Sequence, residues 1–146
     1  MVHSLSTEIA INASPDKVWN ALTDFESYPT WNPFIKSISG ILTVGQRLVV
    51  RLEPPGASGM TFKPKVTNVE VNKRFSWLGH LLVPGLFDGE HIFELSGDGN
   101  GGTRFVQREN FNGILIPLLR KMIDNNTKQG FESMNQKLKT LAETAK

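Results

Sequence analysis

The C-terminal third of the chain, residues 103–145, limits the possible folds most strongly. It begins with an alternating run, TRFVQRENF, that is typical of a strand and that ends at a break, Asn112-Gly113. From there to the C-terminus, apolar residues recur at steps of three and four, which predicts one helix of about thirty residues. A helix this long in a chain of 146 residues needs a sheet to cover its apolar face. We therefore expect a sheet packed on a long C-terminal helix, with a space between the two as the expected location of the functional site.

The composition is that of one globular domain, which we expect to cover residues 1–146. The hydrophobic content of 39% and the charged content of 21% are ordinary for a soluble chain. Cysteine is absent, which excludes disulfides, a thiolate nucleophile and a thiolate metal site. The N-terminus has no secretory pattern, and no apolar run approaches membrane-spanning length. The expectation is a cytoplasmic protein without stable membrane insertion, although transient membrane contact is left open.

Charge and motifs exclude several other classes. The net charge is only +2, and the C-terminal helix carries no block of like charge, so a nucleic-acid partner is not expected. His3, His80 and His91 are widely spaced and form no metal-ligand motif, so no metal and no cofactor are expected. The glycine-rich segment 97–102 lies between two predicted strands and has no helix after it, which indicates a hairpin turn rather than a dinucleotide-binding loop.

The remaining pattern predicts a strand at 7–11, a helix that begins at Ser14-Pro15, a second short helix around 29–33, and then six strands. These strands are expected at 35–41, 48–52, 60–71, 75–79, 89–95 and 103–111. Within 60–71 the apolar residues change parity, which predicts a bulge near Thr67-Asn68.

This order of elements resembles the helix-grip fold of the START and birch-pollen-allergen superfamily, also called SRPBCC, and within it the polyketide cyclase/dehydrase and lipid-transport branch. The segments 13–35, 60–79 and 89–118 carry the resemblance. It implies an α+β fold in which a curved seven-stranded antiparallel sheet wraps around a long C-terminal helix, with two short helices after the first strand. Members of the superfamily bind lipids, hormones, quinones or polyketides and share no catalytic motif, so the resemblance implies a fold more than an activity.

Strand alternation predicts which polar residues face the interior. In 103–111, the face with Phe105 and Phe111 also carries Gln107 and Glu109, and in 89–95 the inward residues include His91. If Leu95 pairs with Phe105, His91 lies opposite Glu109, with Cβ atoms about 5 Å apart. The pair has three interpretations: a general base oriented by the carboxylate, a polar anchor for a ligand oxygen, or a buried pair that satisfies itself.

The candidate ligand-binding residues come from the inward strand positions and from the helix. They are Phe62, Trp77, His91, Phe93, Gln107, Glu109, Phe111, Met122, Asn126 and Met134. Only His91 and Glu109 are candidates for catalysis. Each aromatic candidate can equally be a core residue, and methionine fills ordinary cores as well as ligand pockets.

The turn LLVPGLF at 81–87 is apolar where turns are normally polar. It fits a lid over a cavity, a membrane-contact loop or a dimer patch, and the resemblance favours the lid. The first functional hypothesis is binding, and possible transport, of a small hydrophobic molecule. The alternatives are a polyketide cyclase or dehydratase that uses His91 and Glu109, and an interaction module with a filled interior. The identity of the ligand, the presence of a reaction, and the choice between monomer and homodimer are left open.

Overall fold

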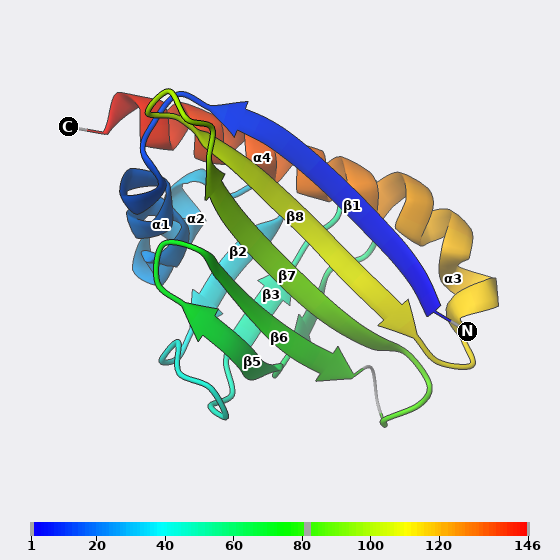
Figure 1. Cartoon of the computed structure of the whole chain (residues 1–146). Coiled ribbons are helices and arrows are strands. Elements are labelled where there is room, and N and C mark those ends of the chain that lie inside the picture. The colour runs from blue at the N-terminus through cyan, green and yellow to red at the C-terminus, as the bar shows by residue number, and fades with distance from the viewer. Residues whose placement is uncertain (1, 81–82, 146) are drawn as a thin grey trace.

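The computed structural model describes residues 2–80 and 83–145 and has the α+β helix-grip architecture that the sequence predicts (Figure 1). The strands are β1 (Val2–Ile11), β2 (Ile35–Ser39), β3 (Val49–Leu52), β4 (Met60–Phe62), β5 (Lys65–Glu70), β6 (Arg74–His80), β7 (Asp88–Gly97) and β8 (Thr103–Asn112). The helices are α1 (Pro15–Thr23), η1 (Phe25–Ser27), α2 (Tyr28–Trp31), α3 (Ile116–Met122), η2 (Ile123–Thr127) and α4 (Lys128–Thr144).

The strands form two hydrogen-bonded groups rather than one seven-stranded sheet. Five strands pair in the order β1-β8-β7-β6-β5, and three pair in the order β2-β3-β4. The described residues contain eight strands because the predicted strand 60–71 is split around Pro64, which has no N–H to donate to a ladder. An isolated bridge between Arg47 and Lys65 joins the two groups. The predicted bulge is confirmed, since the pairing of β5 with β6 shifts between Val66 and Asn68.

The C-terminal helix runs through α3, η2 and α4 and lies along β1 behind the five-stranded sheet (Figure 1). Its central part, η2, is π-helical, a local widening that is frequent at functional sites. Gly130 of α4 allows a close approach, because the ring of Phe34 lies directly on it. A Cβ at Gly130 would be 2.8 Å from Phe34 Cε1.

Aromatic side chains fill the half of the interior next to α1. Phe93 of β7 stacks on Phe75 of β6 with ring centroids 4.7 Å apart, and Trp77 packs edge-on against it at 5.4 Å. Trp19 of α1 contacts Phe75 at 5.8 Å, and α4 adds the fully buried Phe131. This half of the molecule is solid core.

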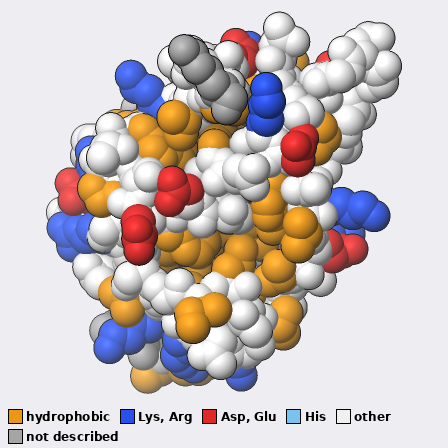
Figure 2. Space-filling view, turned by 90° about the vertical axis from the view of Figure 1, so that its left-hand side faces the viewer, with side chains coloured by type: hydrophobic (Ala, Val, Ile, Leu, Met, Phe, Trp, Pro, Cys, Tyr) orange, Lys and Arg blue, Asp and Glu red, His pale blue; other side chains and the backbone are white. Residues whose placement is uncertain are grey.

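The surface on the side of α1 and α2 shows hydrophobic side chains gathered near its centre, with charged side chains of both signs around them (Figure 2). Within the described ranges, none of the helices combines the length and the apolar character needed to cross a bilayer.

Candidate functional site

The interior opens into a cavity where the inward side chains of the sheet change from aromatic rings to glycine. Along β6 and β7 the inward cross-strand pairs are Phe75 with Phe93, then Trp77 with His91, then Gly79 with Gly89. The last pair has no side chains to fill the space beneath the helix. A cavity of about 360 Å³ lies there, a size within the usual range for ligand sites.

The cavity wall is mainly apolar and comes from all layers of the fold. The sheets contribute Phe62, Gly79, Gly89, Glu109 and Phe111; the helix contributes Leu119, Met122 and Thr127; the loops contribute Phe34, Pro54, Ser58 and Phe87. The glycines fit tightly against their neighbours. A Cβ at Gly79 would lie 3.0 Å from Phe62 Cδ2, and one at Gly89 would lie 3.2 Å from Glu109 Cδ.

The predicted register of β7 and β8 is confirmed, with Leu95 opposite Phe105, Phe93 opposite Gln107 and His91 opposite Glu109. The hydrogen bonding differs from a simple pair. His91 Nδ1 lies 3.6 Å from Glu109 Oε1, which is too long for a hydrogen bond, whereas His91 Nε2 lies 2.9 Å from Gln107 Oε1.

A chain of hydrogen bonds continues from Gln107 to the helix and back to the sheet. Gln107 Nε2 donates to Asn135 Oδ1 (2.8 Å), Asn135 Nδ2 donates to Thr7 Oγ1 (2.9 Å), and Thr7 Oγ1 donates to the backbone carbonyl of Gln107 (3.0 Å). A carbonyl oxygen can only accept, so the donors along this chain of hydrogen bonds all point in one direction. Gln107 Oε1 must then accept from His91, which places the proton of the imidazole on Nε2 and leaves Nδ1 as a lone pair facing Glu109.

Burial keeps both members of the His91–Glu109 pair neutral near pH 7. Desolvation lowers the pKa of His91 to about 3, against the opposing effect of its hydrogen bond to Gln107. Desolvation also raises the pKa of Glu109 to about 8. His91 is 1% exposed, while the Glu109 side chain keeps 14% accessibility and lines the cavity. The pair is therefore a buried neutral imidazole behind a protonated carboxyl, not an ion pair.

Two loops stand at the edge of the cavity. In the predicted lid, Leu81 and Leu82 lie outside the described residues. Phe87 lines the cavity and packs on Phe111 with ring centroids 5.6 Å apart. Asp88 fixes the base of this loop, since it accepts from Gly85 N at 3.1 Å and lies 2.7 Å from the His80 ring.

The second loop, residues 53–59, is held by the π-helical turn. Asn126 Nδ2 donates to the Pro55 carbonyl at 2.8 Å. This contact places Pro54 and Ser58 against the cavity, and it accounts for Asn126 without any contact to a ligand.

Comparison with known proteins identifies the family. The family described as polyketide cyclase / dehydrase and lipid transport matches residues 2–143, nearly the whole chain. The chain belongs to this family. Among curated proteins, the search found no significant match.

Several solved structures share the fold of this chain. The Zhui aromatase/cyclase from Streptomyces sp. R1128 superposes with a TM-score of 0.78 at 14% identity, over 98% of this chain and 94% of that one. Protein MLL2253 from Mesorhizobium loti superposes with a TM-score of 0.74 at 24% identity, over 99% of both chains. A START superfamily protein from Mycobacterium smegmatis superposes with a TM-score of 0.71 at 20% identity, over 95% of this chain and 99% of that one.

In this family member, the structure places the ten predicted ligand-binding residues in different environments. Phe62, Glu109, Phe111 and Met122 line the cavity. The other six do not. His91 and Gln107 are buried in the hydrogen-bonded chain, Asn126 holds loop 53–59, and Trp77, Phe93 and Met134 belong to the solid core. Strand parity correctly gave the inward face but not which end of that face is hollow.

Sequence reasoning missed most of the cavity wall, including Phe34, Leu52, Pro54, Met60 and Leu119. One available signal was the pair Gly79 and Gly89, which occupy inward positions at the facing ends of consecutive strands. Glycine in a strand often marks a place that must stay free of side chains. The loop residues carried no periodic signal.

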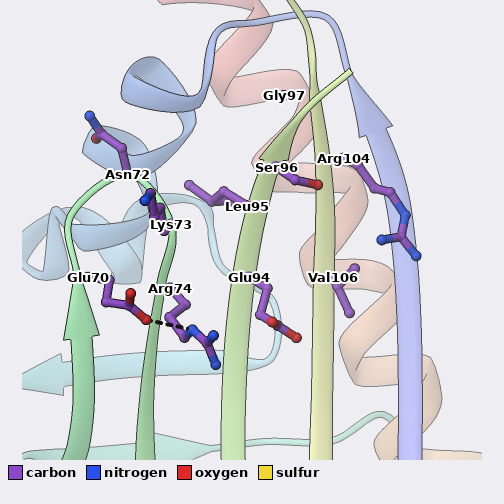
Figure 3. A pocket seen from close by; sticks show the side chains of 10 residues that line it. All are labelled: Glu70, Asn72, Lys73, Arg74, Glu94, Leu95, Ser96, Gly97, Arg104 and Val106. Carbon is purple, nitrogen blue, oxygen red and sulfur yellow. Dashed lines mark ion pairs between the residues drawn. The ribbon is translucent and has the colours of Figure 1, made fainter. Parts of the chain in front are cut away.

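A second depression, of about 470 Å³, lies on the outer face of the sheet over β6, β7 and β8 (Figure 3). Its charged side chains are largely paired with each other or with neighbours. Arg74 Nε lies 2.7 Å from Glu70 Oε2, Arg108 Nε lies 2.7 Å from Glu94 Oε1, and Arg104 pairs with Glu8. Paired, solvent-exposed charges offer little to a ligand. In the part of the chain that the structure describes, no three His, Asp or Glu side chains are grouped to hold a metal ion.

Proposed function

We propose that this protein binds a small hydrophobic molecule in the cavity between the sheet and the C-terminal helix. The observation that carries the proposal is the apolar cavity wall. Among the described residues that line this wall, Glu109 has the only carboxyl, and that carboxyl is neutral near pH 7. Burial of apolar ligand surface supplies affinity at about 25 cal/mol per Å², while a polar group in the wall orients the ligand.

The size of the cavity favours a compact ligand. Its volume of about 360 Å³ is near the lower end of the 300–1,000 Å³ typical of ligand pockets. A molecule with a few fused rings, a quinone head or a short single-chain lipid matches this space better than a two-chain lipid does. The family description, which names polyketides and lipids, agrees with ligands of this kind.

A reaction is the second candidate function, and the geometry changes which residue would act. Both ring nitrogens of His91 face protein groups, Gln107 and Glu109, and the ring is almost fully buried. Glu109 lines the cavity, and its raised pKa of about 8 suits proton exchange near neutral pH. In an enzyme of this architecture, Glu109 is the acid–base group, and His91 is buried behind it, away from the substrate. The third hypothesis, an interaction module, requires a filled interior. The cavity therefore disfavours this hypothesis.

The binding function can be tested with a fluorescent apolar probe such as N-phenylnaphthylamine. Gly79→Val places a side chain in the cavity beside Phe62, and we expect probe affinity to fall roughly tenfold or more, a loss of about 1.4 kcal/mol or more. Gly97→Val is the matched control in β7, because a Cβ at Gly97 meets nothing within 4 Å. Thermal melting of both variants verifies folding. Equal probe binding by a folded Gly79→Val variant rules out the cavity as the site.

Native mass spectrometry of the protein purified from its own host separates carriage from turnover. A co-purifying intact hydrophobic molecule supports binding and transport. A ligand that is chemically converted by the unmodified protein, but only bound by Glu109→Gln, supports the enzyme.

A further inference from the structure

The hydrogen-bonded chain behind the cavity determines what Glu109 can offer to a ligand. Because the chain ends on the Gln107 carbonyl, it orients every donor in one direction and leaves His91 Nδ1 as a lone pair toward Glu109. His91 therefore donates nothing to the carboxyl. None of the described residues forms a hydrogen bond to the carboxyl oxygens of Glu109 either, so the ionised form has no donor to stabilise it.

The protonated carboxyl therefore has a free O–H. His91 Nδ1, at 3.6 Å, is beyond hydrogen-bond distance, and the cavity lies on the accessible side of the group. An apolar ligand that fills the cavity would bury this O–H without a partner, which is unfavourable by about 1–3 kcal/mol. A ligand oxygen that accepts this proton in a hydrogen bond removes that cost.

The cavity offers no counterpart for an anionic ligand. The one basic residue among the described residues of its wall is His80, and the ring of His80 is already bonded to Asp88 at 2.7 Å. An anion would thus be buried without a cation and with few donors, which is strongly unfavourable. A hydrocarbon would fit but would leave the Glu109 O–H unsatisfied.

We propose that the cavity selects neutral molecules that carry a carbonyl oxygen, such as ketones or quinones, over carboxylates and over plain hydrocarbons of the same shape, through a hydrogen bond donated by Glu109. This inference rests on the proposed binding function and adds the chemical class of the ligand.

Three probes with one aromatic skeleton test the selection: acetylnaphthalene, naphthoate and ethylnaphthalene, substituted at the same ring position. Calorimetry, or competition with the fluorescent probe, compares the affinities of the three probes at pH 6. At this pH naphthoate is ionised and Glu109 is protonated. We expect the ketone to bind about threefold to tenfold more tightly than the hydrocarbon, as one neutral hydrogen bond provides, and the carboxylate to bind most weakly.

Two substitutions at the same position separate hydrogen bonding from shape. Glu109→Gln keeps a donor in the amide and should retain a preference for the ketone. Glu109→Leu has a similar volume without a donor and should bind ketone and hydrocarbon equally. A ketone preference that survives in Glu109→Leu, or naphthoate that binds as well as the ketone, overturns the inference.

The design also distinguishes this inference from the function on which it rests. If ethylnaphthalene binds and the ketone gains nothing, the selection is wrong and hydrophobic binding stands. If none of the three probes binds the unmodified protein, the binding function fails, and the ligand class fails with it.

Discussion

Gly79 and Gly89 lie directly opposite each other on β6 and β7, one inward pair beyond Trp77 and His91. This relationship divides the interior. On one side, rings from the sheet, α1 and α4 form a solid core. On the other, the absence of two side chains leaves room for a guest molecule, and the neutral carboxyl of Glu109 stands at the boundary.

Gly89→Ala should weaken ligand binding without unfolding the protein. The added Cβ meets the carboxyl end of Glu109, a flexible group that can turn into the cavity and occupy ligand space. Probe titration measures the affinity and thermal melting measures the stability. Gly97→Ala, in the same strand with open space around it, serves as the control. Unchanged affinity in Gly89→Ala would show that Glu109 does not border the ligand.

Gly130→Ala should destabilise the protein, although alanine normally favours a helix by about 1 kcal/mol relative to glycine. The new Cβ would lie 2.8 Å from Phe34 Cε1, in a buried contact where overpacking costs about 1–3 kcal/mol. Urea unfolding gives the free energy of each variant. Gln129→Ala, at the exposed neighbouring position, should be close to neutral. A more stable Gly130→Ala variant would contradict the close packing.

The free energy of unfolding should reach a plateau between about pH 4.5 and 6.5. His91 has a folded pKa of about 3, below its ordinary 6.5, so its contribution is present above pH 6.5 and is lost as the pH falls toward 3. Glu109 has a folded pKa of about 8, above its ordinary 4.5, so its contribution is present below pH 4.5 and is lost as the pH rises toward 8. Between the two ordinary values the opposite slopes cancel.

Comparison with Glu109→Gln isolates the alkaline part of this profile. The stability of the unmodified protein relative to the variant should fall by roughly 3 to 5 kcal/mol between pH 4.5 and 8 and then stay constant. Chemical denaturation at several pH values measures it. A difference that does not vary with pH would mean that Glu109 titrates at its ordinary pKa in the folded protein.

The His91 ring should carry its proton on Nε2 and should stay neutral down to about pH 4. The direction of the chain through Gln107, Asn135 and Thr7 determines the tautomer, and burial lowers the pKa to about 3. Nitrogen-15 NMR distinguishes a protonated from an unprotonated ring nitrogen. A proton on Nδ1 would mean that these hydrogen bonds run in the opposite direction, and it would remove the basis for a free donor at Glu109.

Phe87→Ser should accelerate probe release by roughly tenfold, the factor for about 1.4 kcal/mol of lost apolar contact at the cavity edge. Stopped-flow displacement measures the rate. Val83→Ser, at a 54% exposed position in the same loop, should leave the rate unchanged. A lower melting temperature with an unchanged release rate would assign Phe87 to packing rather than to a lid.

Local patterns in the sequence determined the elements, the inward faces and the register. Period-two alternation in 89–95 and 103–111 gave the inward faces, and the assumed pairing of Leu95 with Phe105 then placed His91 opposite Glu109. A slip of one residue would have turned one of the two side chains outward. Apolar residues that recur at three- and four-residue steps after Asn112 gave the long helix, because this spacing places them on one helix face.

Only the tertiary structure decided where the interior is hollow and how its polar groups pair. Trp77 and Gly79 share one face of one strand, yet one is core and the other is cavity wall, because the rings that fill the space come from α1 and α4. Gln107 takes the hydrogen bond that opposition alone would give to Glu109, because Asn135 of the helix reaches into the sheet and orients it. Such contacts join residues far apart in the chain, and no local spacing encodes them.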